Sequence, residues 1–181
     1  MDAMKAEGRP FIGILFVGLI LTPNGPKVLE YNARFGDPEA MNVLSILSSS
    51  FTDICSGIAS GRLNADRVSF SNKATVCKYV VPEGYGTEPK AGKEISIDEE
   101  SIENEGAMVY YAMVDKKGGK IYTTTSRSAG VVGIADTLEE AEKVCEKALM
   151  HVKGSALFVR HDIGKADLVQ KRIDHMSQIR G

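Results

Sequence analysis

Residues 27–39 read Lys-Val-Leu-Glu-Tyr-Asn-Ala-Arg-Phe-Gly-Asp-Pro-Glu, and this stretch decides how the chain is interpreted. Side chains alternate between the two faces of an extended strand, so Glu30, Asn32 and Arg34 share one face. The opposite face carries an apolar set suited to packing, Leu29, Tyr31, Ala33 and Phe35. The strand is expected to stop at Gly36, where Asp37-Pro38-Glu39 opens a helix.

The polar face lines up a carboxylate, a carboxamide and a guanidinium, each about 6–7 Å from the next. The oxygens of Glu30 and Asn32 suit a hard cation such as Mg²⁺. Arg34 suits a phosphate or carboxylate held by that cation, and the following helix start is also favourable to anions. The alternative is an ordinary solvated strand face. Three polar groups in register before a helix start favour the binding site.

Composition excludes several classes of function. The chain has 181 residues, with 22 basic and 24 acidic side chains and a net charge of −2, which offers no electrostatic footprint for nucleic acid or for a membrane surface. The apolar run 11–21 is about half of the ~20 residues that span a bilayer, and a buried strand is expected there. Three widely separated cysteines read as small buried hydrophobes in a reducing compartment, which predicts a cytoplasmic protein.

The first part of the chain is expected to contain a β-hairpin and two helices. The strands 11–21 and 27–34 are joined by a turn cluster, and the first strand is apolar on both faces, which predicts an interior position in a sheet. A helix with Met41, Leu44 and Leu47 on one face follows, and a second helix runs from Ser50 to Gly61. The helical pair is expected to lie against the sheet. Residues 63–73 are polar and aperiodic and are interpreted as a linker between units 1–62 and 74–181.

The second part reads as strands with one amphipathic helix. Strands are expected over residues 74–81, 94–97, 107–114, 120–125, 129–135 and 157–160, with a Lys-Lys-Gly-Gly hairpin turn at 116–119. Thr137 and Glu140 form a capping box for a helix expected to end at Gly154, and a helical tail starts near Lys165. The fold class predicted for the whole chain is α+β.

The string at 30–39, Glu-Tyr-Asn-Ala-Arg-Phe-Gly-Asp-Pro-Glu, resembles the phosphoribosylamine–glycine ligases, also called glycinamide ribonucleotide synthetases, of the ATP-grasp superfamily. Shorter segments at 8–13, 18–19, 82–86, 127–130, 137–141 and 162–164 extend the likeness over essentially the whole chain. Biotin-dependent carboxylases carry a similar Glu-x-Asn-x-Arg strand, but theirs continues as Gln-Val-Glu-His. The resemblance implies the closing portion of an ATP-grasp domain followed by a small C-terminal domain of mixed sheet and helix.

The resemblance also implies roles for individual residues. Glu30 and Asn32 would be ligands of Mg²⁺ (or Mn²⁺), with ATP as co-substrate, and Arg34 would contact the transferring phosphoryl group or the glycine carboxylate. Asp37 and Glu39 would meet the substrate amine or ribose hydroxyls, unless Asp37 is a helix cap and Glu39 a partner of the helix dipole. Arg127 would anchor the substrate phosphate, unless it is an ordinary surface arginine.

The implied reaction joins glycine to 5-phosphoribosylamine through a glycyl phosphate, giving glycinamide ribonucleotide in purine biosynthesis. The chain is short for that family, so the N-terminal half, with the glycine-rich loop and the adenine-binding strand, is expected to be supplied in cis or in trans. The isolated chain is therefore expected to be inactive, and apolar surface left open at the docking site would favour self-association. The alternative is a non-catalytic binding or assembly module that retains the fold.

Overall fold

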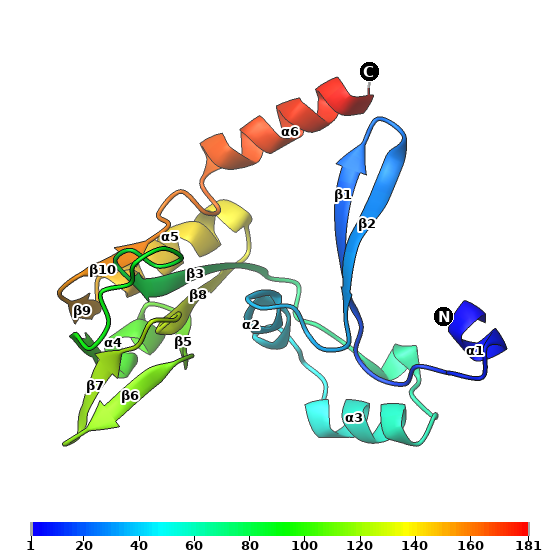
Figure 1. The fold of residues 1–181 in the computed structure, drawn as a ribbon, viewed down its shortest axis with the longest axis horizontal. Helices are drawn as coiled ribbons and strands as arrows, with labels where there is room; N and C mark the ends of the chain where they lie inside the picture. Colours follow the sequence, from blue (N-terminus) through cyan, green and yellow to red (C-terminus); the bar gives the residue numbers. More distant parts are fainter. Residues whose placement is uncertain (1, 181) are drawn as a thin grey trace.

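The structure is a computed structural model, and it describes residues 2–180, leaving out the side chain of Arg180. The chain forms an extended N-terminal part and a C-terminal part in which helices pack on antiparallel sheets (Figure 1). This mixture of helices and antiparallel sheets confirms the predicted α+β class. The elements of the first part are α1 (Asp2–Ala6), β1 (Phe16–Thr22), β2 (Gly25–Asn32), α2 (Glu39–Leu44), α3 (Phe51–Ala59) and the 3₁₀ helix η1 (Ala65–Arg67).

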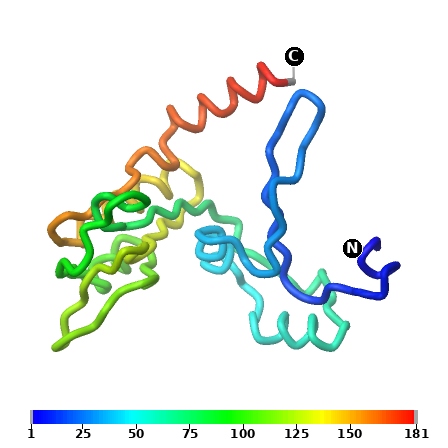
Figure 2. The backbone as a smooth tube through the Cα atoms, viewed as in Figure 1, coloured from blue at the N-terminus to red at the C-terminus, as the bar shows by residue number. Residues whose placement is uncertain are grey.

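Strands β1 and β2 form the predicted hairpin, but β1 is not interior to a larger sheet. The two strands pair with each other as a two-stranded antiparallel ribbon, with a bulge at Gly18/Leu19. Figure 2 shows the ribbon standing apart from the C-terminal sheets. The apolar side chains of the hairpin are therefore exposed, Leu29 by 66% and Tyr31 by 65%. The expectation of an interior strand is wrong here because the described residues bring no third strand to either edge.

Helices α2 and α3 confirm the predicted helical pair, yet α2 lies against the C-terminal sheet instead of against the hairpin. It contacts β3 and β8, and the Met41 side chain occupies the space that a Cβ at Gly130 would need. Asn42 Nδ2 donates to Thr75 Oγ1 at 3.0 Å. Serine 50 caps α3, as Asp53 N donates to its Oγ at 3.2 Å. The segment between α3 and β3 contains η1, and the division at 63–73 stays a prediction.

The C-terminal part is built on two four-stranded antiparallel sheets, with strand orders β10-β3-β8-β5 and β6-β7-β4-β9. Helix α5 lies on β3 and β8. The core between them contains Val76, Val80, Val131, Ala141 and Cys145. The elements are β3 (Ala74–Pro82), β4 (Glu94–Ile97), α4 (Glu99–Asn104), β5 (Ala107–Tyr111), β6 (Val114–Lys117), β7 (Lys120–Thr123), β8 (Ala129–Ala135), α5 (Leu138–Leu149), β9 (Val152–Gly154), β10 (Leu157–Val159) and α6 (Ala166–Arg180).

Several predicted boundaries are confirmed and several are wrong. The capping box of Thr137 and Glu140 is present, and the bounds of β4 and β8 agree with the prediction. Helix α5 ends at Leu149 rather than at Gly154, because residues 152–154 pair with β4 as strand β9. The strand expected over 107–114 is divided between β5 and β6, which belong to different sheets. Helix α4 was missed; Asp98 caps it by accepting from Ser101 N at 3.1 Å.

Candidate functional site

The polar pair on β2 lies as the alternation of the strand requires. Asn32 Nδ2 donates to Glu30 Oε1 at 3.1 Å, so the two side chains share one face of the ribbon. Glu30 pairs with Gly18 of β1, and a Cβ at Gly18 would stand 3.1 Å from Glu30 Cγ. A glycine opposite Glu30 therefore gives the carboxylate side chain room to lie across the ribbon.

The donor chemistry of this pair fits a magnesium ion. Rotating the Asn32 amide by 180° places its carbonyl oxygen, in place of the NH₂ group, beside the Glu30 carboxylate. Two oxygens are then adjacent on one exposed edge. Mg²⁺ in phosphate-handling sites is commonly held by one or two protein oxygens, with waters and substrate phosphates as the other ligands. Glu30 and Asn32 are the residues that would hold the ion.

Arg34 lies just beyond the strand. Because β2 ends at Asn32, the alternation that grouped Arg34 with the polar pair stops two residues before it. Its Nη1 donates to the carbonyl oxygen of Phe35 at 2.7 Å, which anchors an otherwise exposed side chain. The remaining guanidinium hydrogens stay available for an anion.

Asp37 does not cap the helix that follows it. Pro38 occupies the N-cap position of α2 and makes no side-chain cap bond, and Glu39 is the first helical residue. The Asp37 carboxylate instead reaches the C-terminal part, where its Oδ1 accepts from the Tyr79 hydroxyl at 2.5 Å and its Oδ2 from Arg127 Nη1 at 2.7 Å. The turn after β2 is thereby joined to β3 and to the loop before β8.

Arg127 is held on three sides. Besides its ion pair with Asp37, its guanidinium stacks over the rings of Tyr79, at 5.2 Å, and Tyr85, at 6.0 Å. Burial and the hydrogen bond to Asp37 raise the pKa of Tyr79, so its hydroxyl stays protonated as the donor. Arg127 is therefore an organised cation rather than a loose surface arginine.

These residues surround a cavity of about 250 Å³. One wall is the face of β3 opposite to α5, from which Cys77, Tyr79 and Val81 project at alternate positions. The complete lining is Pro38, Cys77, Tyr79, Val81, Tyr85, Arg127, Phe158, Arg160 and Ile163. Sequence reasoning missed Tyr79, Tyr85 and Arg160, although the alternation of residues 77, 79 and 81 could have indicated a shared face.

The structure thus places the predicted site residues in two groups. Glu30 and Asn32 lie on the ribbon, with Arg34 beyond its end, whereas Asp37 pairs with Arg127, which lines the cavity. Glu39 lies beside the turn, and its carboxylate occupies the space that a Cβ at Gly36 would need. Within residues 2–180, none of the helices combines the length and apolar character that crossing a membrane demands.

Comparison with known proteins identifies the family. Residues 75–166 match the model of the phosphoribosylglycinamide synthetase C domain, which is half of the chain. Residues 1–40 match the ATP-grasp (A) domain of the same synthetase. The chain belongs to the phosphoribosylglycinamide synthetase family. This membership confirms the predicted arrangement, in which part of an ATP-grasp domain precedes a C-terminal domain.

Relatives of this synthetase family match almost the whole chain. Phosphoribosylamine–glycine ligase of Methanocaldococcus jannaschii is 49% identical over 180 residues, and that of Methanosarcina barkeri is 52% identical over 184 residues. Each match covers 99% of this chain but 40–41% of the relative, so the chain spans about two fifths of the length of these relatives. The crystal structure of the Thermotoga maritima phosphoribosylamine–glycine ligase superposes with a TM-score of 0.75 at 28% identity, covering 89% of this chain and 39% of that one.

Proposed function

We propose that this chain is the C-terminal portion of an ATP- and Mg²⁺-dependent phosphoribosylamine–glycine ligase, which forms glycinamide ribonucleotide from 5-phosphoribosylamine and glycine. The observation that carries the proposal is the Glu30–Asn32 pair, whose side chains lie 3.1 Å apart on β2, one residue before the Arg-Phe-Gly-Asp-Pro-Glu string. Membership of the synthetase family supports the same assignment. Manganese would serve with the same oxygen ligands.

The proposed chemistry needs positioning and charge neutralisation more than a side-chain nucleophile. The γ-phosphoryl group of ATP passes to the glycine carboxylate and releases ADP. The amine of phosphoribosylamine then attacks the acyl carbon, forms the C–N bond, expels phosphate and loses a proton. Glu30 and Asn32 would hold a magnesium ion, which would supply positive charge to the phosphate oxygens. Arg34, anchored on the Phe35 carbonyl, contacts the transferring phosphoryl group or the glycine carboxylate.

The cavity residues are assigned to the second substrate. Arg127 binds the phosphate of the ribosylamine from the position in which Asp37 and the tyrosine rings hold it. Asp37 and Glu39, on the turn that joins β2 to α2, meet the substrate amine or the ribose hydroxyls. The short turn between residues 32 and 39 thus connects the proposed metal face with the proposed ribosylamine site.

The chain is proposed to need an upstream portion, in cis or in trans, for catalysis. Its relatives are ligases of about two and a half times its length, and the exposed apolar side chains of the β1–β2 ribbon offer that portion a contact surface. In its absence the same surface favours self-association. The free cysteines suit a reducing compartment such as the cytoplasm.

The decisive experiment adds an N-terminal portion from a related ligase to this chain. The purified chain, alone and mixed with the N-terminal three fifths of the M. jannaschii ligase, is incubated with ATP, Mg²⁺, glycine and phosphoribosylamine formed from ribose 5-phosphate and ammonia. Product is expected in the mixture and in neither half alone. E30A and N32A should each lower the rate about 100-fold or more, whereas K27A, on the same strand, should not. Product from the chain alone would contradict the proposal.

The same experiment tests the alternative of a non-catalytic assembly module. That alternative requires that the mixture gives no product. It also requires that Mg²⁺ has no effect on nucleotide binding, and that E30A and N32A behave like wild type. The adjacent oxygen donors of Glu30 and Asn32 favour the ligase.

A further inference from the structure

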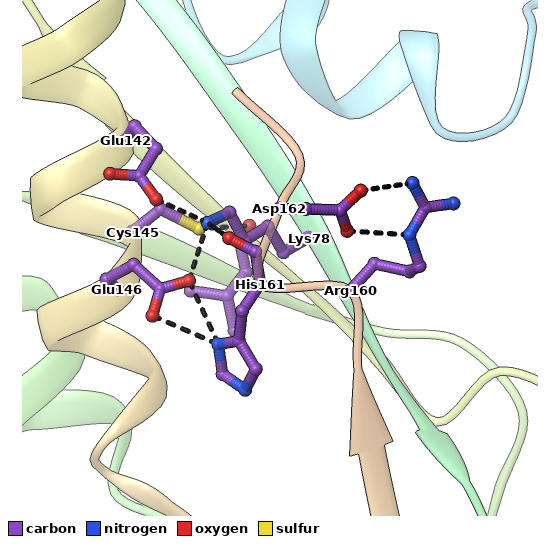
Figure 3. Close-up of polar contacts among 8 residues, drawn as sticks. Lys78, Glu142, Cys145, Glu146, Arg160, His161 and Asp162 are labelled. Atoms are coloured by element: carbon purple, nitrogen blue, oxygen red, sulfur yellow. Dashed lines mark hydrogen bonds and ion pairs between the residues drawn. The ribbon is translucent and has the colours of Figure 1, made fainter. Parts of the chain in front are cut away.

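Lys78 is a buried charge on β3 that the proposed reaction does not use. Its side chain is 0% exposed, and it projects from the face of β3 that α5 covers, opposite to the cavity. Nζ donates to Glu142 Oε1 at 2.7 Å, to Glu146 Oε1 at 2.5 Å and to the carbonyl oxygen of His161 at 3.1 Å (Figure 3). All three ammonium hydrogens therefore have acceptors, two on α5 and one on the turn after β10.

The charge on Lys78 is maintained by its partners. Burial opposes the charge, but the hydrogen bonds that Lys78 donates to Glu142 and Glu146 outweigh burial and raise the pKa of Lys78. Glu146 is shared, because both of its carboxylate oxygens also lie 3.0 Å from His161 Nδ1. The turn is thus held at the backbone carbonyl of His161 and at its ring. An apolar residue at position 78 would leave that carbonyl without its donor and the two glutamates of α5 without their counter-charge.

His161 lies between Arg160 and Asp162, whose side chains form an ion pair with two hydrogen bonds. Arg160 Nε donates to Asp162 Oδ1 at 2.7 Å, and Arg160 Nη2 donates to Asp162 Oδ2 at 2.6 Å. This bidentate pair occupies one edge of the guanidinium and fixes its plane. The Nη1 group and the second hydrogen of Nη2 form the other edge, which suits two oxygens of an anion. Arg160 and Ile163, on either side of the held turn, both line the cavity that contains Arg127.

We propose that Arg160 is a second anion-binding residue of the cavity, and that Lys78 positions it by fixing the turn 160–163. The ligand is a sugar phosphate. Arg127 and Arg160 each keep N–H donors beyond those that bind Asp37 and Asp162, and these donors suit the oxygens of a phosphate. Tyr79, Tyr85 and Phe158 offer flat apolar walls to the sugar ring. Naming the sugar as the ribosylamine rests on the proposed function, and the stable probe is ribose 5-phosphate.

Binding of ribose 5-phosphate to the 181-residue chain, measured by calorimetry, tests the role of Arg160. R160Q is expected to weaken binding at least tenfold, while the control R172Q, at an exposed position on α6, leaves it unchanged. Ribose is expected not to bind measurably, and inorganic phosphate to compete weakly, because it engages the arginines without the ring walls. Equal affinity of R160Q and wild type, or no binding by wild type, would overturn the proposal.

A double-mutant cycle tests whether Lys78 acts through Arg160. K78M is expected to weaken binding in the wild-type chain and to add nothing in the R160Q background. A purely structural role would weaken binding equally in both backgrounds and would refute the positioning role. Because K78M leaves two carboxylates unpaired, the cycle is repeated with K78M/E142Q/E146Q, in which amides replace them. If this variant folds and binds ribose 5-phosphate as tightly as wild type, the positioning role is also refuted.

The ligase assay separates this proposal from the proposed function. If the two-part enzyme is active and R160Q leaves its KM for phosphoribosylamine unchanged, the Arg160 proposal fails and the ligase assignment stands. If this chain gives no product when it is mixed with the N-terminal portion of the ligase, yet R160Q abolishes binding of ribose 5-phosphate, the ligase assignment fails and the sugar phosphate site stands.

Discussion

Oδ2 of Asp37 accepts a hydrogen bond from Nη1 of Arg127 at 2.7 Å, across 90 positions of the sequence. The other oxygen of the same carboxylate accepts from the Tyr79 hydroxyl. One aspartate therefore links the turn that follows the proposed metal face to the wall of the cavity. The proposed metal face and the proposed ribosylamine site are therefore connected by side-chain hydrogen bonds as well as by the backbone.

The Asp37–Arg127 pair should show a modest coupling energy. The two side chains are 48% and 37% exposed, so water and salt screen their attraction. A double-mutant cycle of D37N and R127Q in urea unfolding is expected to give about 1 kcal/mol. D66N, at an exposed aspartate on η1, is the control and should be neutral. If the losses of unfolding free energy in D37N and R127Q simply add in the double mutant, the ion pair contributes nothing to stability.

Removing Lys78 alone should be strongly destabilising. K78M leaves Glu142 and Glu146 without their buried counter-charge, which is expected to cost about 4 kcal/mol of unfolding free energy. The triple variant K78M/E142Q/E146Q should recover most of this loss and lie within about 2 kcal/mol of wild type. Urea titrations of the three proteins check both values. A K78M chain as stable as wild type would mean that the cluster is not a buried ion network.

Lowering the pH should remove the stabilisation that Glu146 gives to the fold. Burial raises its pKa, but the hydrogen bonds from Lys78 and His161 outweigh burial, and the pKa of Glu146 is lowered below its usual 4.5. A lowered pKa stabilises the fold above the unfolded value and loses that effect as the pH falls through the folded value. The groups facing this carboxylate are Lys78, His161 and, on its own helix, Glu142. The difference in unfolding free energy between wild type and E146Q should therefore shrink as the pH falls from about 4.5 toward about 3.

Two glycines of β8 should respond differently to alanine. A Cβ at Gly133 would clash with backbone atoms of α5, the carbonyl oxygen of Ala141 and the amide nitrogen of Cys145. G133A should therefore cost about 3 kcal/mol, because a helix must move away from the sheet. At Gly130 the obstacle is the flexible end of the Met41 side chain, and G130A should cost about 1 kcal/mol. Thermal unfolding of both variants measures the difference, and equal costs would contradict the close approach of α5 to β8.

The cysteines should differ in reactivity. Burial raises the pKa of Cys77 to about 12 and that of Cys145 to about 11, whereas Cys55 is exposed. Iodoacetamide at pH 8 reacts with thiolates, so one thiol per native chain should be modified, and three after denaturation. C55S should then show no fast labelling. Fast labelling of C55S would indicate that the core around Cys77 or Cys145 opens at this pH.

The sequence predicted those features that local chemistry determines. The alternation of β2 places Glu30 beside Asn32, and the capping box fixes the start of α5 at Thr137. Long-range partners were not predictable in this way. The apolar run of β1 indicated packing but not which element would cover it. Lys78 looks like a solvent-facing residue of a strand until Glu142, 64 positions later, is seen to pair with it. Asp37 had the local signature of a helix cap, and a better partner at Arg127 overrides it.

The β1–β2 ribbon has two outer edges, and each presents a row of backbone N–H and C=O groups that its partner strand does not use. Water satisfies these groups while the ribbon stands alone. A strand that docks there would exchange hydrogen bonds to water for main-chain hydrogen bonds. These bonds depend on the geometry of the two strands far more than on their side chains. Docking of the proposed upstream portion at these edges would therefore tolerate wide sequence variation, and portions taken from distant relatives should still assemble with this chain.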